Sequence, residues 1–264
     1  MNSGPIGIFD SGVGGLTVVK EIISAMPNED IVYFGDTARV PYGSKSKETV
    51  TKFACQITRF LLTKQVKIIV IACNTVSTNS YEPLKAEFAL PIFEMARHGA
   101  LQSIESFNIR SLGVIGTEAT IRSGVYEDFI TARYPKIKVY SKACPLFVPL
   151  AEEGWTDNDA AHSAAKLYLS ELAGKIDGIL LACTHYPLLE NCIAEAANTT
   201  IINPAKAAAG YIKDFLSEKN MAAGNNVSSK YKFYVSDNTE KFGHISKNIL
   251  GKSYPAEKVD IEKY

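Results

Sequence analysis

Short apolar runs recur along the chain, and segments with helical spacing of apolar residues separate them. Four runs are rich in Ile, Val and Phe, as strands buried on both faces are, and they cover residues 4–9, 30–34, 68–72 and 90–93. Helices are expected between them, over residues 16–26, 47–64 and from residue 75 onward. Strands that alternate with helices in this way predict βαβ units and a parallel sheet.

The order of elements restarts near residue 111. Strand-like runs follow at residues 111–116, 136–140, 178–182 and 200–203. Corresponding positions lie 106 to 110 residues apart, as Ser11 does from Thr117 and Cys73 from Cys183. This spacing predicts that one α/β unit occurs twice, with the third strand of each copy ending in Ala-Cys.

The last part of the chain matches neither repeat. It contains an expected helix, a polar stretch typical of a surface loop, a strand and a second helix, over residues 205–218, 220–230, 231–235 and 239–250. This is too little to form a third core, so it is expected to pack on one of the two halves. The predicted domains are 1–96 and 97–206, with a C-terminal tail of 207–264.

Composition limits the classes of function. The 264 residues are 46% hydrophobic, enough for substantial cores. The 28 basic and 28 acidic residues balance, which argues against nucleic acid as a partner and favours a small-molecule substrate. The N-terminal residues show no signal-peptide pattern, and no apolar run approaches the roughly 20 residues of a membrane span. We therefore expect a cytoplasmic protein that does not insert into membranes.

The five cysteines are an odd set without a C-x-x-C pair, which fits reduced cytosolic thiols better than disulfides or structural zinc. Cys55 and Cys192 lie in expected helices, where a cysteine is usually a small buried hydrophobe.

Cys73 and Cys183 differ from the others because each follows a buried strand. The carboxyl ends of parallel strands are where open α/β sheets form ligand crevices. Two thiols on opposite sides of such a crevice could remove a proton from one face of a carbon and return one to the other, which is racemisation or epimerisation. Two alternatives remain open: packing of both cysteines in the core, and metal ligation by Cys73, Cys183 and His185, for which no fourth ligand stands at a recognisable spacing.

Glycines and small polar residues surround the same strand ends. Gly12-Val-Gly-Gly15 follows the first strand but lacks the third glycine of G-x-G-x-x-G, so nucleotide binding is weakly supported. These glycines could instead bring backbone N–H groups close to an anion such as a carboxylate. Further donors are expected at this edge, although each alone could be a helix cap: Ser11, Asn74, Thr75, Thr117 and Thr184.

Taken together, longer motifs resemble those of the glutamate racemase family, within the aspartate/glutamate racemase superfamily. The resemblance spans about residues 6 to 205 and rests on Asp10-Ser-Gly-Val-Gly-Gly-Leu-Thr17, Tyr33-Phe-Gly-Asp-Thr37, Pro41-Tyr-Gly43, Ala72-Cys-Asn-Thr75, Gly113-Val-Ile-Gly-Thr117, Cys144-Pro145 with Phe147-Val-Pro-Leu150, and Cys183-Thr-His-Tyr-Pro-Leu-Leu189.

The resemblance implies a two-domain α/β fold with a mostly parallel sheet in each half, the active site in the cleft between them, and a tail that returns to the first half. It also implies interconversion of L- and D-glutamate without cofactor or metal, supplying D-glutamate for peptidoglycan. Cys73 would exchange the proton on the D-face, assisted by Asp10. Cys183 would act on the L-face, assisted by His185, with Glu152 nearby.

By the same resemblance, glutamate would be held by a set that includes Asp10 and His185 and continues with Ser11, Pro41, Tyr42, Gly43, Asn74, Thr75, Thr117 and Thr184. Members of the family are often dimers, so a homodimer is implied. Three residues depart from the usual pattern, Val76, Ala182 and Asn203. An aspartate racemase is the nearest rival interpretation, and a two-lobed binding protein for a small anion is a rival that is not an enzyme.

Overall fold

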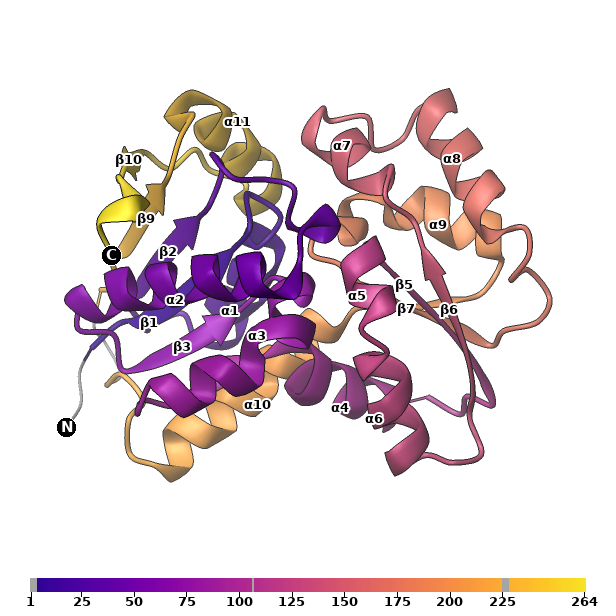
Figure 1. Ribbon diagram of the computed structural model, residues 1–264, viewed down its shortest axis with the longest axis horizontal. Helices are drawn as coiled ribbons and strands as arrows, with labels where there is room; N and C mark the ends of the chain where they lie inside the picture. The colour runs from indigo at the N-terminus through magenta and orange to yellow at the C-terminus, as the bar shows by residue number, and fades with distance from the viewer. Residues whose placement is uncertain (1–3, 106, 225–227) are drawn as a thin grey trace.

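The computed structural model describes residues 4–105, 107–224 and 228–264, and it contains two β-sheets side by side in separate lobes (Figure 1). The first sheet comprises β1 (Ile6–Asp10), β2 (Ile31–Gly35), β3 (Ile68–Ile71), β4 (Ile92–Glu94), β9 (Tyr231–Val235) and β10 (Ala256–Lys258). The second comprises β5 (Ser111–Gly116), β6 (Lys138–Ala143), β7 (Gly178–Ala182) and β8 (Thr200–Ile202). The paired strands run parallel in both sheets, which confirms the predicted α/β class.

Strand order supports the predicted duplication. The second sheet has the order β6-β5-β7-β8, and the first contains β2-β1-β3-β4. Each strand of one series therefore occupies the place of its counterpart in the other. β3 and β7, the strands that precede Cys73 and Cys183, each lie between two other strands and are fully buried.

Helices cover both faces of the first sheet, because successive strand residues point to opposite sides. Ile8 packs with α1 (Leu16–Ala25), α10 (Pro204–Glu218) and α11 (Thr239–Leu250). The next residue, Phe9, packs on the other side with α2 (Lys47–Thr63) and α3 (Asn74–Glu87). Burial on both faces explains the continuous apolar runs in the sequence.

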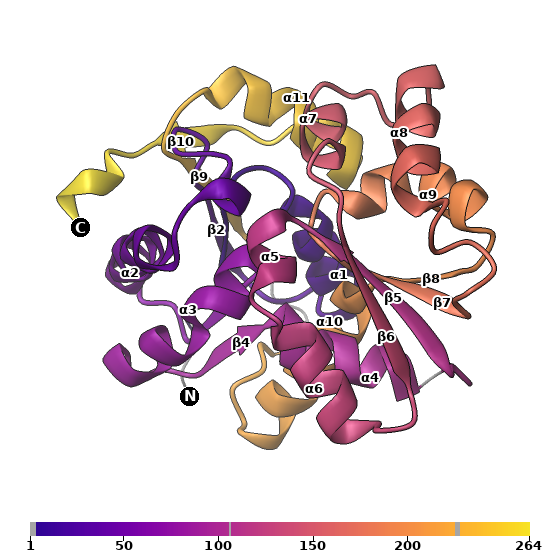
Figure 2. The same cartoon turned by 45° about the vertical axis from the view of Figure 1, so that its right-hand side comes forward.

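The second sheet is covered in the same way. One core includes α7 (Phe147–Glu152), α8 (Asp159–Leu169) and α9 (Glu190–Ala197). The opposite core includes a π-helical turn (Ala96–Ala100), α4 (Leu101–Glu105) and α6 (Val125–Arg133). Short α5 (Glu118–Arg122) lies between the two lobes and contacts α3 and the 3-10 turn Tyr42–Ser44 (Figures 1 and 2). Further 3-10 turns cover Tyr186–Leu189 and Ile261–Lys263.

The tail extends the first sheet. β9 pairs with β2, and β10 pairs with β9, while α11 packs beside α1. Residues 225–227 of the predicted polar loop lie outside the described residues. Asn203, one of the departures from the family pattern, caps α10: its Oδ1 accepts a hydrogen bond from Ala205 N at 3.0 Å, as an aspartate could.

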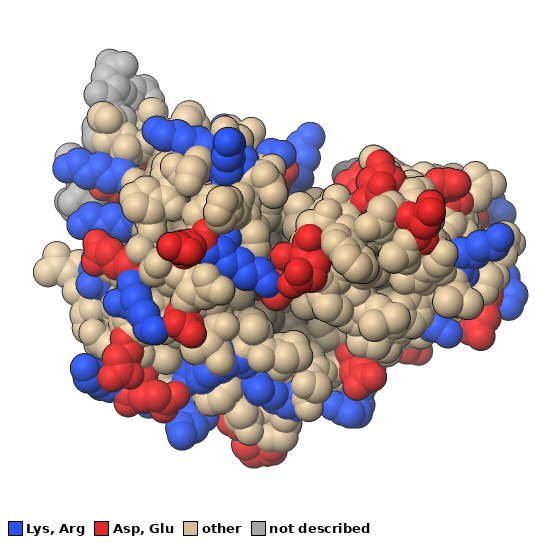
Figure 3. All heavy atoms as spheres, turned by 90° about the horizontal axis from the view of Figure 1, so that it is seen from above, with Lys and Arg blue, Asp and Glu red and all other residues tan. Residues whose placement is uncertain are grey.

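Charges of both signs are interspersed on the face of the molecule shown in Figure 3. In the part of the chain that the structure describes, no helix has the length and apolar character needed to cross a membrane.

Candidate active site

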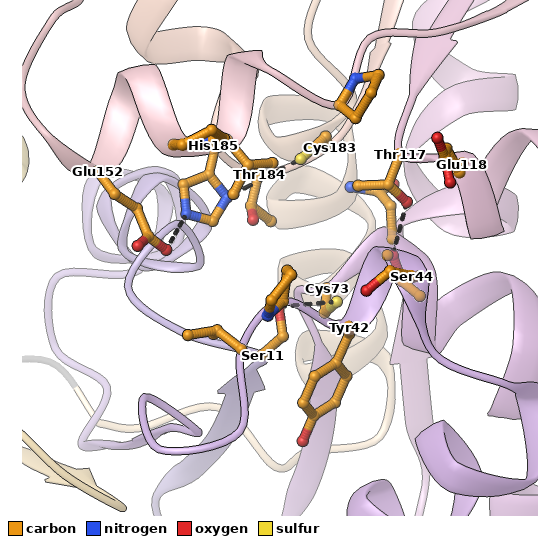
Figure 4. A pocket seen from close by; sticks show the side chains of 18 of the residues that line it. Ser11, Tyr42, Ser44, Cys73, Thr117, Glu118, Glu152, Cys183, Thr184 and His185 are labelled. Atoms are coloured by element: carbon orange, nitrogen blue, oxygen red, sulfur yellow. Dashed lines mark hydrogen bonds and ion pairs between the residues drawn. The ribbon is translucent and has the colours of Figure 1, made fainter.

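A cavity of about 310 Å³ lies between the lobes, at the carboxyl ends of strands from both sheets (Figure 4). Both thiols of interest face it, Cys73 from the first lobe and Cys183 from the second. Every predicted site residue except Asp10 lines this cavity: Ser11, Pro41, Tyr42, Gly43, Cys73, Asn74, Thr75, Thr117, Glu152, Cys183, Thr184 and His185. Strand ends from two duplicated units therefore meet in one enclosed space.

Cys73 lies two residues after the end of β3 and occupies the N-cap position of α3. Its Sγ lies 3.4 Å from Ser11 Oγ. Burial, followed by the negative charge of Asp10, raises the pKa of the Cys73 thiol to about 12. The Ser11 hydroxyl and the Val76 N–H act in the opposite direction, as donors at a helix N-terminus do, but they do not outweigh burial. Burial therefore favours the neutral thiol form of Cys73.

Asp10 lies buried behind the cavity, at the end of β1. Its Oδ2 accepts a hydrogen bond from Gly12 N at 3.0 Å, and its Oδ1 accepts one from Thr184 Oγ1 at 3.2 Å. Burial raises the pKa of this carboxyl group, while His185 and the N–H groups of the glycine loop favour its charged form. The glycine loop, which the sequence suggested could approach a carboxylate, therefore directs the Gly12 N–H group at the protein's own Asp10.

Gly14 allows the lobes to touch at the site. A Cβ atom on Gly14 would lie 2.6 Å from both Thr184 Oγ1 and His185 Nδ1, closer than side chains approach. Thr17 Oγ1, in the same segment, donates to the Thr184 carbonyl oxygen at 3.0 Å. The glycine loop thus packs directly on the residues that follow Cys183.

Cys183 follows β7, and its nearest titratable partner is an imidazole. His185 Nδ1 lies 3.9 Å from the Cys183 Sγ, and His185 Nε2 lies 3.3 Å from Glu152 Oε1. The second contact is an ion pair without hydrogen-bond alignment. Burial alone would lower the pKa of His185, but Cys183, Glu152 and Asp10 outweigh it and raise that pKa to about 10. His185 is therefore a cation at neutral pH.

Glu152 connects this imidazole to the C-terminal tail. Its side chain is 18% exposed, and its Oε2 lies 3.6 Å from Lys241 Nζ on α11. Burial works against the charged carboxylate, yet His185 and Lys241 together lower the pKa of Glu152. The sequence predicted Glu152 but missed Lys241. Because Lys241 is far along the chain in a segment without recognisable motifs, no sequence signal could have found it.

Hydroxyl groups gather where the lobes meet opposite His185. Thr75 Oγ1 lies 2.9 Å from Thr117 Oγ1 and 3.3 Å from Thr120 Oγ1. The Tyr126 hydroxyl donates to Asn74 Oδ1, which fixes that amide from the second lobe. Thr117 also caps α5, with Oγ1 accepting from Thr120 N at 3.3 Å. Thr117 is therefore both a helix cap and a residue that lines the cavity.

Tyr42 lines the cavity, but its hydroxyl donates to Asp36. Figure 4 shows the phenol pointing away from the two thiols, which leaves the backbone of Tyr42 as the part that can contact a ligand. Gly43 lies so close to Thr117 that a Cβ atom there would be 2.7 Å from Thr117 Cβ. The sequence did not predict the remaining lining residues: Val40, Ser44, Glu118, Pro145, Val148, Pro149 and Ala182.

The two remaining departures from the family pattern are buried beside the site. Val76 belongs to the core that contains Cys73, and Ala182 ends β7 directly before Cys183. Neither carries a titratable group, so they affect packing and cavity shape.

The metal alternative is not supported at this site. Among the described residues, Cys73, Cys183 and His185 do not form a group with ligand atoms close enough to hold one ion.

Comparison with known proteins agrees with this geometry. A family model described as Asp/Glu/Hydantoin racemase matches residues 6–212. The chain belongs to the Asp/Glu/hydantoin racemase family. One similar protein, glutamate racemase of Geobacter metallireducens, is 45% identical over 250 residues, 93% of this chain and 92% of that protein.

Solved structures of the Asp/Glu/hydantoin racemase family give the same result. Glutamate racemase from Francisella tularensis in complex with D-glutamate is 39% identical, with a TM-score of 0.92 over 100% of both chains. Glutamate racemase isoform RacE1 from Bacillus anthracis is 35% identical, with a TM-score of 0.94 over 98% of both chains. The predicted resemblance, the two-domain fold and the racemase class are confirmed.

Proposed function

We propose that the protein interconverts L- and D-glutamate by proton exchange at Cα between Cys73 and Cys183. The observation that carries the proposal is the placement of two thiols, from equivalent strand ends of two repeated units, on one cavity. Glutamate is favoured over aspartate because the relatives that are 45% and 39% identical are both named glutamate racemases. The cavity of about 310 Å³ is at the small end of ligand pockets, as a single amino acid requires.

In the proposed reaction, one cysteine acts as a thiolate and the other as a thiol. The thiolate takes the Cα proton from one face of glutamate, and the electron pair left on Cα accepts a proton from the opposite thiol. The two cysteines end in exchanged protonation states, so no oxidant or cofactor is needed. Following the family resemblance, Cys73 serves the D-face and Cys183 the L-face.

The surroundings of each thiol support these roles. On the Cys183 side, the positively charged His185 places Nδ1 3.9 Å from the sulfur. At Cys73, the ammonium group of glutamate would offset the charge of Asp10, and the Val76 N–H would then stabilise the thiolate. Asp10 and His185 are therefore proposed to adjust the protonation of one thiol each.

The remaining polar groups are proposed to hold the substrate. Hydroxyl and amide donors from Ser11, Asn74, Thr75, Thr117 and Thr184 surround the cavity, together with the backbone of Pro41, Tyr42 and Gly43. Fixed donors around the cavity stabilise the negative charge that develops when the Cα proton leaves.

The proposal is tested by incubating the protein with L-glutamate in deuterated water, without added pyridoxal phosphate or metal. D-glutamate carrying deuterium at Cα is expected, as measured by chiral chromatography and mass spectrometry. The double variant Cys73→Ser/Cys183→Ser is the control for other deuterium-exchanging activities. Racemisation of aspartate with glutamate unchanged would establish the rival racemase, and binding of either amino acid without turnover would establish the two-lobed binding protein.

The proposal also covers the biological role, the location, the oligomeric state and the domain boundaries. Supply of D-glutamate for peptidoglycan, a cytoplasmic location and a homodimer are proposed from the family resemblance. The division into domains 1–96 and 97–206, with tail 207–264 in the first lobe, is supported by the pairing of β9 with β2. Sedimentation velocity measures the oligomeric state.

A further inference from the structure

A second cluster of reactive side chains lies in the second lobe, where α8 and α9 begin. Asp157 Oδ1, His162 Nε2 and Cys192 Sγ all lie within 4.8 Å of one another, the one such cluster of three found among the described residues. None of these residues lines the cavity of the candidate active site. The cluster therefore needs an explanation of its own.

Local structure brings the three groups together. The Asn158 side chain caps α8, so Asp157 comes just before the helix and His162 lies one turn inside it. Cys192 is in the first turn of α9, and its Sγ donates to the Thr156 carbonyl oxygen at 3.2 Å. Cys192 is buried, whereas the side chains of Asp157 and His162 are 60% and 38% exposed. The thiol is therefore the buried member of the cluster, and the other two side chains are partly exposed to solvent.

Both nitrogens of His162 are occupied by carboxylates. His162 Nε2 lies 2.8 Å from Asp157 Oδ1, and Nδ1 lies 3.1 Å from Glu195 Oε2. A surface ion pair between Asp157, His162 and Glu195 accounts for these two contacts, and core packing with the hydrogen bond to Thr156 accounts for the burial of the Cys192 thiol. These contacts leave unexplained why ligand atoms of a carboxylate, an imidazole and a thiol meet within 4.8 Å of one another. Metal-binding histidines commonly donate their second N–H to a carboxylate, which aims the first nitrogen at the metal. Glu195 is the carboxylate that contacts the second ring nitrogen of His162.

We propose that Asp157, His162 and Cys192 form a binding site for a divalent cation of the zinc class, with Glu195 orienting His162. Thiolate, imidazole and carboxylate are the donor set that Zn²⁺ and Co²⁺ accept, and three protein ligands leave a fourth position for water. Binding releases the thiol proton of Cys192. The ion joins the start of α8 to α9, so it stabilises the folded second lobe. Cys192 lies 30 residues after His162, and the three ligands follow no motif spacing, which is why the sequence predicted only a packed Cys192.

The test uses Co²⁺ as the probe, because a cobalt–thiolate bond produces a charge-transfer absorption band. The metal-free, reduced Cys73→Ser/Cys183→Ser protein is titrated, so the thiols of the racemase cavity cannot supply the signal. Saturation at one equivalent, with the band removed by added Zn²⁺, is the expected result. No thiolate band at any Co²⁺ concentration would overturn the proposal.

Substitutions in the same background locate the site. Cys192→Ser should abolish the band, His162→Gln should weaken Co²⁺ binding at least 100-fold, and Glu195→Gln should weaken it about 10-fold. Cys55→Ser is the matched control, since Cys55 is also a buried helical cysteine beside a glutamate but has no histidine among its recorded partners. If Cys192→Ser or His162→Gln binds as tightly as the parent, the signal reports an adventitious ion only.

If Cys192→Ser does not fold, the melting temperature with and without Zn²⁺ provides a second test of the metal site. Zn²⁺ should raise the melting temperature of the parent protein but not that of His162→Gln, whose partly exposed side chain allows folding. Equal shifts in both proteins would contradict the proposal. None of these outcomes depends on glutamate racemisation.

Discussion

The surroundings of Cys73 and Cys183 differ although the two cysteines occupy equivalent places in equivalent sheets. Cys73 caps a long helix, α3, and its charged neighbour is the buried carboxylate of Asp10. Cys183 precedes a short 3-10 turn, and its neighbour is the imidazole of His185, which is supported by Glu152. An anion therefore stands behind one thiol and a cation behind the other.

This difference shows what the repeated fold determines and what it leaves free. Strand order and burial place both thiols at the cavity, because each follows the corresponding interior strand of its own sheet. The charged neighbours come from elsewhere: Asp10 lies at the end of β1, and His185 lies two residues after Cys183. A racemase of this kind needs one thiol and one thiolate at a time, so unlike neighbours suit two otherwise similar groups.

Replacement of either thiol is the most severe test of the comparison. Cys73→Ser and Cys183→Ser should each lower kcat by about 10³-fold, because a serine hydroxyl is a much weaker acid than a thiol. Racemisation is followed by circular dichroism. Cys55→Ser, a buried cysteine outside the cavity, should retain normal activity. Near-normal turnover in either cavity variant would remove the two-thiol mechanism.

Asp10→Asn and His185→Asn should distinguish the role of the Cys73 thiol from that of the Cys183 thiol. Each is expected to lower kcat/KM by about 10- to 100-fold, and equally in both directions, because the equilibrium between enantiomers fixes that ratio. With glutamate deuterated at Cα, Asp10→Asn should raise the isotope effect for the D-enantiomer, and His185→Asn that for the L-enantiomer. An increase for the same enantiomer in both variants would contradict the assignment of one tuning residue to each thiol.

Substitution of Lys241 tests whether the C-terminal tail contributes to activity through Glu152 and His185. Lys241→Met removes the cation 3.6 Å from Glu152 and should lower kcat/KM two- to fivefold, since a partly exposed ion pair contributes about 0.3–1 kcal/mol. Lys241→Arg should restore most of the activity. Lys247→Met, on the exposed side of the same helix, is the matched control. Equal losses in Lys241→Met and Lys247→Met would show that only helix stability matters.

The pH dependence of stability is the mildest test. The pKa of His185 rises from 6.5 to about 10 on folding, so its protonated form stabilises the protein fully below pH 6.5, and that contribution disappears as the pH rises through about 10. The melting temperature of the parent protein minus that of His185→Asn should therefore decrease between pH 6.5 and 10. A difference that is constant with pH would mean that His185 is neutral in the folded protein.

Much of the fold was predictable because its strands are buried on both faces and appear as apolar runs. The helix predicted over residues 239–250 coincides with α11, and the strand over 231–235 with β9. β10 was not predicted, since its three residues are only partly buried or exposed and lack an apolar pattern. Short edge strands take their conformation from the neighbouring strand, and this is not visible in local sequence.

The sequence could predict those site residues whose location depends only on their position at the end of a strand. Cys73 and Cys183 were found because a strand end is a property of the local sequence. The direction of the Tyr42 hydroxyl and the contact of Lys241 with Glu152 depend on packing between distant segments, so they could not be predicted. Asp10 was predicted to assist catalysis and bind substrate, but it lies behind the cavity lining, and the hydrogen bond that it accepts from Thr184 crosses the two lobes and leaves no sequence pattern.

The matching strand orders have a consequence for how such a site can evolve. In a dimer of identical units, the two thiols would share one set of neighbours, because every substitution appears in both copies. A single chain that carries both units is free of this restriction. An aspartate can be selected behind one sulfur and a histidine behind the other, and each face of the substrate acquires a catalyst that changes independently.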